Sequence, residues 1–315
     1  MKFFDAEAIR ARLPWPTIIS AIERTLRTEV EAPLRHHHAV TVPGDPTGAL
    51  LLMPAWRGGG RLGVKLVTVF PGNAERGLRS VAAVYVLFSA TDGAPLAMLD
   101  GEELTARRTA AASAYAASKL ARRDAHRLLM IGAGRMARPL IEAHRHVRQL
   151  EQVSIWNRTA ARAEALAEAC ARDGIPARAC ADLAAEAGRA DVISCATLAT
   201  APLVRGEWLR PGVHLDLVGA FRKDMRETDD LCMQRADLIV VDDRTAALVE
   251  GGDVVQPIAS GAIRGEKIAA ELRDFARGTH AGRTHADQIT AFKSVGFALE
   301  DLAAAEAVID AADAS

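Results

Sequence analysis

The chain has 315 residues, of which 50% are hydrophobic and 4% aromatic, and its formal net charge at pH 7 is −1. The near-neutral charge argues against a nucleic-acid partner, and no apolar run approaches the roughly 20 residues that a membrane span needs. The opening residues, MKFFDAEAIRARLPW, contain acids and arginines where a signal peptide needs an unbroken apolar segment. We therefore predict a cytoplasmic protein with no nucleic-acid or membrane partner and, from its length, two domains.

Cysteines and a histidine run are the candidate metal ligands. The cysteines, at positions 170, 180, 195 and 232, form no C-x-x-C pair, so neither a zinc site nor a disulfide framework is indicated. His36, His37 and His38 are consecutive, and consecutive side chains on an extended strand cannot all converge on one ion. We predict no metal site.

The first third of the chain has the alternation of antiparallel strands. We expect strands over residues 48–53, 61–70, 80–88 and 95–99, with a Thr91-Asp92-Gly93 turn before the last of them. Asp100 to Glu103 resembles a capping box, and it opens an alanine-rich helix that we expect to run to about Arg122.

After His126 the pattern changes to alternating strands and helices. Strands are expected at 128–131, 153–157, 191–197, 214–220 and 236–243, and helices at 136–147 and 160–172. A last amphipathic helix, within 295–312 and capped by Ser294, is expected to return to the first domain. We predict an α/β protein in which a Rossmann-type doubly wound sheet, residues 121–291, is inserted in an α+β substrate domain formed by residues 1–120 and 292–315.

Residues 127–137, RLLMIGAGRMA, place the pattern Gly132-x-Gly134-x-x-Ala137 between a strand and a helix. The first glycine permits a tight turn, the second lets the backbone approach a pyrophosphate, and the small alanine allows close packing of helix on strand. A second strand ends at Asn157, where the residue that reads the ribose is expected. The pattern predicts a dinucleotide site, with a glycine turn in another kind of α/β protein as the alternative.

The segment Asn157-Arg158-Thr159 bears on the choice of cofactor. An NAD-selective site has Asp or Glu at this place, and this chain has neither. No carboxylate repels a 2′-phosphate, while Arg158 and the Thr159 hydroxyl can bind one. We predict that NADP(H) is favoured, with NAD(H) as the alternative; an Arg158 that merely faces solvent is the competing interpretation.

Three basic residues of the first domain are candidates for substrate binding. Lys65 lies in the apolar strand GVKLVTVF, where it either reaches an edge or is desolvated with a lowered pKa. Arg35 can face a cleft from an extended segment, and Arg107 and Arg108 are separated by about 100° on their helix, so one can point inward while the other faces water. Two arginines and a lysine around one cavity would clamp a carboxylate.

Four segments, LGVKLVTVFPGN, LTARRTAAASAYAA, IGAGRMA and FKSVGFALEDLAAAEAV, together resemble the ornithine cyclodeaminase/mu-crystallin family over nearly the whole chain. The resemblance implies a homodimer whose first domain forms the subunit interface and closes a cleft over the nicotinamide. It implies that Arg35, Lys65 and Arg108 bind the substrate carboxylate and catalyse, and that Ser80 lies beside cofactor and substrate.

The resemblance also assigns cofactor contacts. It implies that the pyrophosphate is held by Gly132, Ala133, Gly134, Arg135 and Met136, the adenosine ribose by Asn157, Arg158 and Thr159, and the nicotinamide half by Ala196, Thr197 and Val218, with Ser294 approaching from the last segment.

The segment VGAFRKDMRE departs from the cyclodeaminases, which carry an aspartate where this chain has Phe221. An aromatic ring cannot accept an ammonium proton, whereas an apolar wall suits a substrate whose ring is already closed. The sequence therefore resembles the branch that reduces cyclic ketimines. We predict an oxidoreductase that uses NADPH to reduce Δ1-pyrroline-2-carboxylate or Δ1-piperideine-2-carboxylate to L-proline or L-pipecolate, with Lys65 giving the proton directly or through one water.

Three alternatives remain at this point. They are an ornithine cyclodeaminase with tightly held NAD, an enzyme that acts on an open-chain keto acid plus an amine, and a non-catalytic NADPH-dependent binding protein of the crystallin kind. Lys65 together with both arginines favours catalysis, because binding alone needs no desolvated proton donor.

Overall fold

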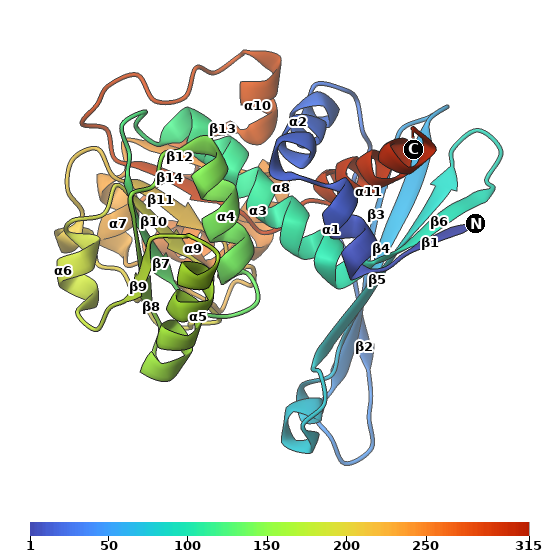
Figure 1. Ribbon diagram of the computed structural model, residues 1–315, viewed down its shortest axis with the longest axis horizontal. Helices are drawn as coiled ribbons and strands as arrows, with labels where there is room; N and C mark the ends of the chain where they lie inside the picture. The colour runs from blue at the N-terminus through green and yellow to red at the C-terminus, as the bar shows by residue number, and fades with distance from the viewer. Residues whose placement is uncertain (315) are drawn as a thin grey trace. The chain divides into compact units, whose positions relative to one another are not determined.

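The computed structural model describes residues 1–314 and divides into two compact units, both drawn in Figure 1. Unit 1 consists of residues 1–108 and the chain from residue 297 onward, and unit 2 of residues 109–296. Among the described residues, no helix is both long and apolar enough to cross a membrane. The assignment of substrate binding and dimerisation to one domain and of cofactor binding to the other stays a prediction.

The sheet of unit 1 has the order β1-β6-β5-β4-β3-β2. Its strands pair antiparallel except that β1 runs parallel to β6, which confirms the predicted meander. The histidine run lies on the edge strand and is exposed. The bounds are β1 Lys2–Phe4, β2 His36–Val40, β3 Gly48–Trp56, β4 Arg61–Val69, β5 Val81–Ser89 and β6 Pro95–Asp100, with the 3-10 helix η1 at Pro71–Arg76 between β4 and β5.

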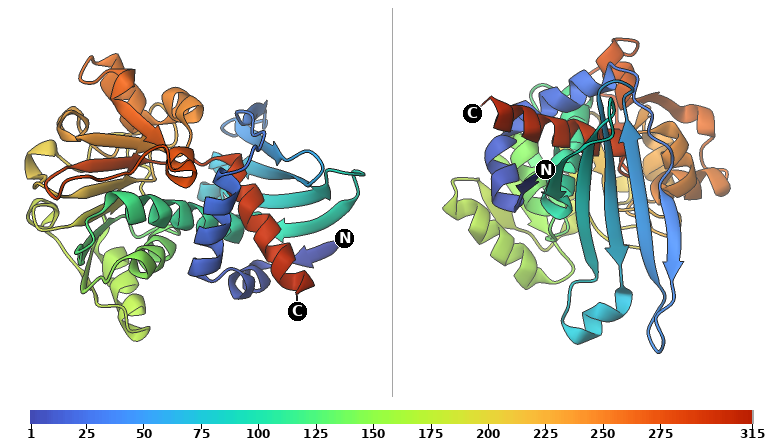
Figure 2. Two further views of the ribbon diagram at one scale, coloured as in Figure 1. Left: turned by 90° about the horizontal axis from the view of Figure 1, so that it is seen from above. Right: turned by 90° about the vertical axis from the view of Figure 1, so that its right-hand side faces the viewer.

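Helices cover one face of this sheet. Helix α11 (Ala298–Asp313) packs on β3, β4 and α2 (Trp15–Leu26), and α1 (Ala6–Arg12) packs on β6 and α11; Figure 2 shows α2 and α11 together on that face. Because side chains alternate along a strand, Met53, Lys65 and Tyr85 point to the covered face and are buried. A Cβ added to Gly63 would lie 1.9 Å from Tyr85 Oη, so the tyrosine ring occupies the space above this glycine.

The last helix differs from the prediction in two respects. It begins at Ala298 with Phe297 as its N-cap residue, and Ser294 instead donates its hydroxyl to Asp242, 3.0 Å away. It is also not amphipathic, because every residue from Ala298 to Ile309 is buried between the sheet and the two N-terminal helices. The start of α3 (Gly101–Leu120) agrees with the prediction, since the Asp100 carboxylate accepts the Glu103 N–H at 2.7 Å.

The sheet of unit 2 contains eight parallel strands in the order β13-β12-β14-β11-β10-β7-β8-β9. The predicted doubly wound sheet is therefore confirmed, and the strand order reverses at β7, where a sheet of this kind binds its ligand. The strands are β7 Arg127–Ile131, β8 Gln152–Trp156, β9 Ala177–Ala179, β10 Val192–Cys195, β11 His214–Leu217, β12 Leu238–Val241, β13 Ile268–Glu271 and β14 Thr290–Lys293.

Helices connect these strands. Helix α4 packs on β7 and α5 packs on β8 and β9, while α10 lies against β13. The helical bounds are α4 Ala137–Val147, α5 Ala160–Arg172, α6 Leu183–Ala187, α7 Asp230–Arg235, α8 Arg244–Glu250, α9 Gly252–Ala259 and α10 Leu272–Arg277, with 3-10 helices η2 at Gly206–Trp208 and η3 at Gly265–Lys267.

Candidate functional site

Five parallel strands of unit 2 end in register. Strands β8, β7, β10, β11 and β14 place their last residues side by side, namely Trp156, Ile131, Cys195, Leu217 and Lys293. The residue that follows each strand is one of the predicted cofactor contacts: Asn157, Gly132, Ala196, Val218 and Ser294. The fold thus brings candidates from five distant segments to one edge of the sheet, which we call the cofactor edge.

The turn after β7 has the geometry that a pyrophosphate needs. Gly132 has φ +106°, and a Cβ there would lie 2.7 Å from the Ala196 carbonyl oxygen, so a side chain is excluded. Met136 caps α4 without a side-chain hydrogen bond, which leaves the first N–H groups of this helix without a capping side chain. An anion fits at such a helix start, and these residues are therefore suited to a dinucleotide.

Asn157 joins the end of β8 to the glycine turn. Its Oδ1 accepts the Ala133 N–H at 3.2 Å and its Nδ2 donates to the Thr159 carbonyl at 3.0 Å. Arg158 and Thr159 are exposed. The amide therefore shapes the turn, while the next two residues present a guanidinium and a hydroxyl to solvent at the predicted ribose position.

The predicted nicotinamide side is more closed. Val218 is buried, and Ala196 and Thr197 are half-buried. The Ser294 hydroxyl is engaged by Asp242, so a cofactor contact through that hydroxyl stays a prediction. Phe221, the predicted substrate wall, is 38% exposed in unit 2.

Unit 1 gathers its predicted basic residues around a carboxylate. Lys65 on β4 is 2% exposed, and its Nζ lies 2.9 Å and 2.8 Å from the two carboxylate oxygens of Asp301. Arg108 on α3 donates from Nε to Asp301 Oδ1 at 2.9 Å and from a terminal nitrogen to Glu300 Oε2 at 2.7 Å. We call these four residues, with Arg35, the Lys65 cluster.

The environment of Lys65 makes it a better proton donor than an ordinary lysine. Burial, followed by the positive charge of Arg108, lowers the pKa of Lys65 to about 8, although the Asp301 carboxylate opposes the shift. The charge of Arg35 contributes to the same lowering, which places this half-buried arginine near the amine. Arg35 and Arg108, both predicted from the sequence, thus act on the pKa of the third predicted residue, Lys65.

The sequence predicted that one of Arg107 and Arg108 points inward while the other faces water, but neither of them faces water. Arg107 donates to the Leu13 carbonyl from two nitrogens, at 3.0 Å and 2.7 Å, and its guanidinium lies 4.3 Å from the centroid of the Trp15 ring. It is therefore a packing residue between α3 and α2, and the buried Arg108 is the member of the pair that reaches the Lys65 cluster.

Sequence reasoning missed the acids of this site. Glu300 and Asp301 are fully buried in the first turn of α11, where the helix dipole favours negative charge. Two adjacent acids at the start of a mostly apolar helix were the available signal. Tyr85, also missed, is buried beside Asp301, and burial raises the pKa of its hydroxyl well above the usual value.

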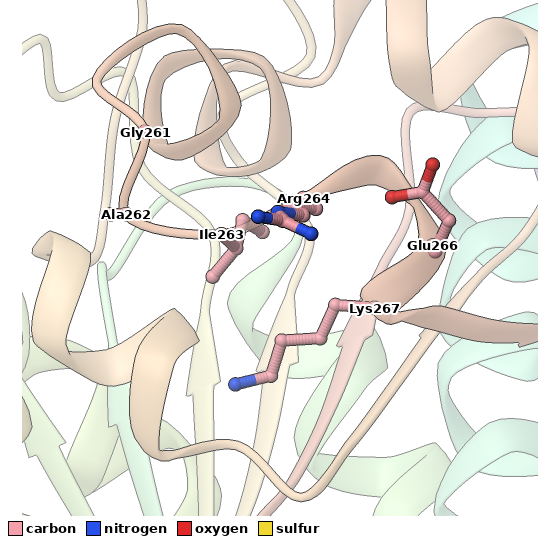
Figure 3. A pocket seen from close by; sticks show the side chains of 6 residues that line it. All are labelled: Gly261, Ala262, Ile263, Arg264, Glu266 and Lys267. Carbon is pink, nitrogen blue, oxygen red and sulfur yellow. The ribbon is translucent and has the colours of Figure 1, made fainter.

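A separate hollow on unit 2 contains none of the predicted site residues. The residues that line it follow α9 and precede β13 in the chain, and Figure 3 labels all of them: Gly261, Ala262, Ile263, Arg264, Glu266 and Lys267. Lys267 donates to the Gln234 carbonyl. Among residues 1–314, no group of three or more His, Cys, Asp or Glu side chains is arranged to hold a metal ion.

A doubly wound sheet with a glycine turn at its switch point defines a dinucleotide-binding protein. The chain belongs to the ornithine cyclodeaminase/mu-crystallin family, whose model matches residues 4–315. The family is one of NAD(P)-dependent oxidoreductases and includes imine reductases.

Similar proteins illustrate its range. The Delta(1)-pyrroline-2-carboxylate reductase of Paracoccus denitrificans is 42% identical over 294 residues, which are 92% of this chain and 90% of the relative. The solved structure of the Thermococcus litoralis Delta(1)-pyrroline-2-carboxylate reductase, in complex with NADH and L-proline, matches with a TM-score of 0.92, 32% identity and coverage of 100% and 98%. An archaeal alanine dehydrogenase, a dimer with bound NAD, matches with a TM-score of 0.90, 29% identity and coverage of 100% and 96%.

The Lys65 cluster generates a stability prediction. Replacing Asp301 with Asn removes the negative charge that faces two buried cations, and breaking a buried ion pair from one side costs about 3–5 kcal/mol. We expect urea unfolding to show a loss of this size. Asp310→Asn is the matched control, because Asp310 is 64% exposed and its ion pair with Arg61 should contribute less than about 1 kcal/mol. Equal effects of the two substitutions would contradict the assignment of Asp301 as the central acid.

Proposed function

We propose that the protein reduces the C=N bond of a cyclic imino acid, Δ1-pyrroline-2-carboxylate or Δ1-piperideine-2-carboxylate, to L-proline or L-pipecolate. The observation that carries the proposal is the buried Lys65 of lowered pKa, held by Asp301 beside Arg108. The similarity to a reductase of this name and to a structure with bound NADH and L-proline supports the same substrate class.

The roles of the residues follow from their chemistry. Arg35 and Arg108 bind the substrate carboxylate, because a guanidinium matches a carboxylate with two parallel hydrogen bonds. Lys65 donates a proton to the ring nitrogen, directly or through one water, so that the C=N bond gains a proton at nitrogen while its carbon is reduced. The reduced nicotinamide, when bound, supplies the hydride for that carbon.

We propose NADPH as the preferred cofactor. The proposal is supported by residues 157–159, which contain no carboxylate that would repel a 2′-phosphate. The exposed Arg158 and Thr159 offer a cation and a hydroxyl to such a phosphate. Residues of the cofactor edge would hold the group, with Gly132 to Met136 at the pyrophosphate and Ala196, Thr197 and Val218 at the nicotinamide half.

Turnover tests the function and the cofactor together. We expect the purified protein to oxidise NADPH in the presence of either cyclic imine, with a higher kcat/KM than with NADH. Lys65→Met should lower kcat by at least about 100-fold, the usual contribution of a general acid, whereas Lys2→Met should not, because Lys2 is exposed on β1. Ammonia release from ornithine, turnover only with pyruvate and ammonia, or cofactor binding with no turnover would each contradict the proposal.

The pH dependence tests the role of Lys65 independently. Its amine must be protonated to act as the donor, so activity is retained below its pKa of about 8 and lost above it. We expect kcat/KM to fall about tenfold for each pH unit beyond that value. Cofactor affinity measured over the same range separates this effect from binding. A flat profile up to about pH 10 would rule out Lys65 as the donor.

We also propose that the protein forms a homodimer through the uncovered face of the unit 1 sheet, seen in the right-hand view of Figure 2. This face carries half-buried apolar side chains on the central strands, including Leu52, Val64, Leu66, Val84 and Val86, and exposed apolar patches of this kind mark interfaces. The archaeal alanine dehydrogenase is a dimer.

Sedimentation velocity tests the dimer. We expect the native protein to sediment as a dimer and Val64→Asp to sediment as a folded monomer, because the new charge would be buried in the interface. Val249→Asp is the control, since Val249 is 54% exposed on α8 of unit 2. A native protein that is monomeric at micromolar concentration would contradict the proposal.

A further inference from the structure

A buried carboxyl group lies directly beneath the predicted nicotinamide side of the cofactor edge. Glu227 is fully buried in unit 2. Its Oε1 accepts the N–H and the hydroxyl of Thr197, at 2.7 Å and 2.8 Å, and its Oε2 accepts the Gly219 N–H at 2.8 Å. One side chain therefore fastens the segment after β10 to the segment after β11.

The contact requires a glycine on one side. A Cβ added to Gly219 would lie 2.2 Å from Glu227 Oε1 and 2.3 Å from the Thr197 carbonyl oxygen. Glu227 is itself fixed, because its backbone N–H donates to Asp253 Oδ1 at 2.9 Å, an oxygen that also accepts from the N–H and hydroxyl of Thr228. Backbone N–H groups of Thr197 and Gly219 thus hold the carboxyl group, and the Asp253 side chain holds the backbone of Glu227.

The charges around Glu227 do not balance. The groups that face it are Asp253 on α9, Lys293 on β14 and Cys195 on β10. Lys293 lies 3.7 Å from Asp253 Oδ2 and donates to the Leu217 carbonyl, so it compensates one acid. Burial raises the pKa of the Cys195 thiol well above its usual value, and the thiol stays neutral. An ionised Glu227 therefore leaves one buried negative charge in excess.

This excess charge has a counterpart in nicotinamide chemistry. The oxidised nicotinamide ring is a cation and the reduced ring is neutral, and a buried negative charge acts on a nearby cation through a low dielectric. We propose that ionised Glu227 positions the Thr197 and Gly219 segments and raises the affinity of the site for the oxidised cofactor relative to the reduced one. The inference rests on the proposed function for the location of the nicotinamide.

Protonation of Glu227 would change the contact as well as the charge. Burial, followed by the repulsion of Asp253, raises the pKa of Glu227 to about 7. A protonated carboxyl group must donate one hydrogen, and the Gly219 and Thr197 N–H groups cannot accept it. The Thr197 hydroxyl can, by reversing its bond, although it also accepts the Ala199 N–H at 3.3 Å.

Binding of matched cofactor pairs over pH tests the proposal. We would measure the dissociation constants of NAD⁺ and NADH, and of NADP⁺ and NADPH, by calorimetry from about pH 5.5 to about pH 8.5. The ratio within each pair cancels the titration of the phosphate groups that both members share. In the native protein the preference for the oxidised member should rise with pH by about fivefold or more, the lower end of usual coupling energies. Oxidised cofactor should also release protons on binding near neutral pH, a readout that a purely structural residue does not produce.

Substitution completes the test. Glu227→Gln keeps the size and removes the charge, and its oxidised-to-reduced ratio should be independent of pH. Glu186→Gln is the control, because Glu186 is a carboxylate of the same unit whose partners, Ser154 and Arg178, are not predicted cofactor contacts; it should retain the native pH dependence.

The outcomes separate this inference from the proposed function. A ratio that is flat with pH in the native protein, or that still varies in Glu227→Gln, overturns the role of Glu227. The native measurement stands alone if the variant does not fold. If both cofactor pairs bind as expected but no imine is reduced, the proposed reaction fails and the inference holds. If no nicotinamide cofactor binds, both fail.

Discussion

The interaction on which unit 1 depends is the neutralisation of two buried cations, Lys65 and Arg108, by the adjacent acids Asp301 and Glu300. Lys65 comes from β4 and Arg108 from α3, and neither side chain can be buried at acceptable cost without a carboxylate in reach. Helix α11 supplies that carboxylate from its first turn, where its dipole already favours an acid. Because α11 is buried from Ala298 to Ile309, the packing of the core and the placement of the charges are fixed by the same helix.

In unit 2 the corresponding constraint is the register of a parallel sheet. Strands that end together deliver one residue each to a common edge, whatever their separation in the sequence. The turn at Gly132 then has to pass the Ala196 carbonyl with no side chain, and the turn at Gly219 has to pass Thr197 in the same way. Two glycines in different segments are thus explained by one geometry, the close approach of successive loops at the cofactor edge.

Periodic segments were predictable from the sequence, and charge partners across long separations were not. The antiparallel strands follow from the alternation of apolar and polar residues, the strand before Gly132 from its apolar run, and the helix over 160–172 from its helical period. Strands β9, β13 and β14 were missed because β9 has only three residues, and β13 (IAAE) and β14 (TAFK) lack the runs of β-branched residues that indicate a strand. Ser294 resembles a helix cap, but its hydroxyl has a better partner in Asp242, more than 50 residues away in sequence. Lys65 was recognisable as an anomaly in an apolar strand, whereas its partner Asp301, 236 residues later, follows only from the fold.

Both buried clusters combine acids with cations. In the Lys65 cluster, Lys65 and Arg108 pair with Asp301 and Glu300, and the charge of Arg35 also acts on Lys65; beneath the cofactor edge, Glu227 and Asp253 face Lys293. If a substrate carboxylate binds in the first cluster, as proposed, it would oppose the loss of a proton from Lys65 and so favour the donor form. A cationic nicotinamide at the cofactor edge would favour the ionised state of Glu227. Under the two proposals, each ligand would stabilise the protonation state in which its cluster binds it.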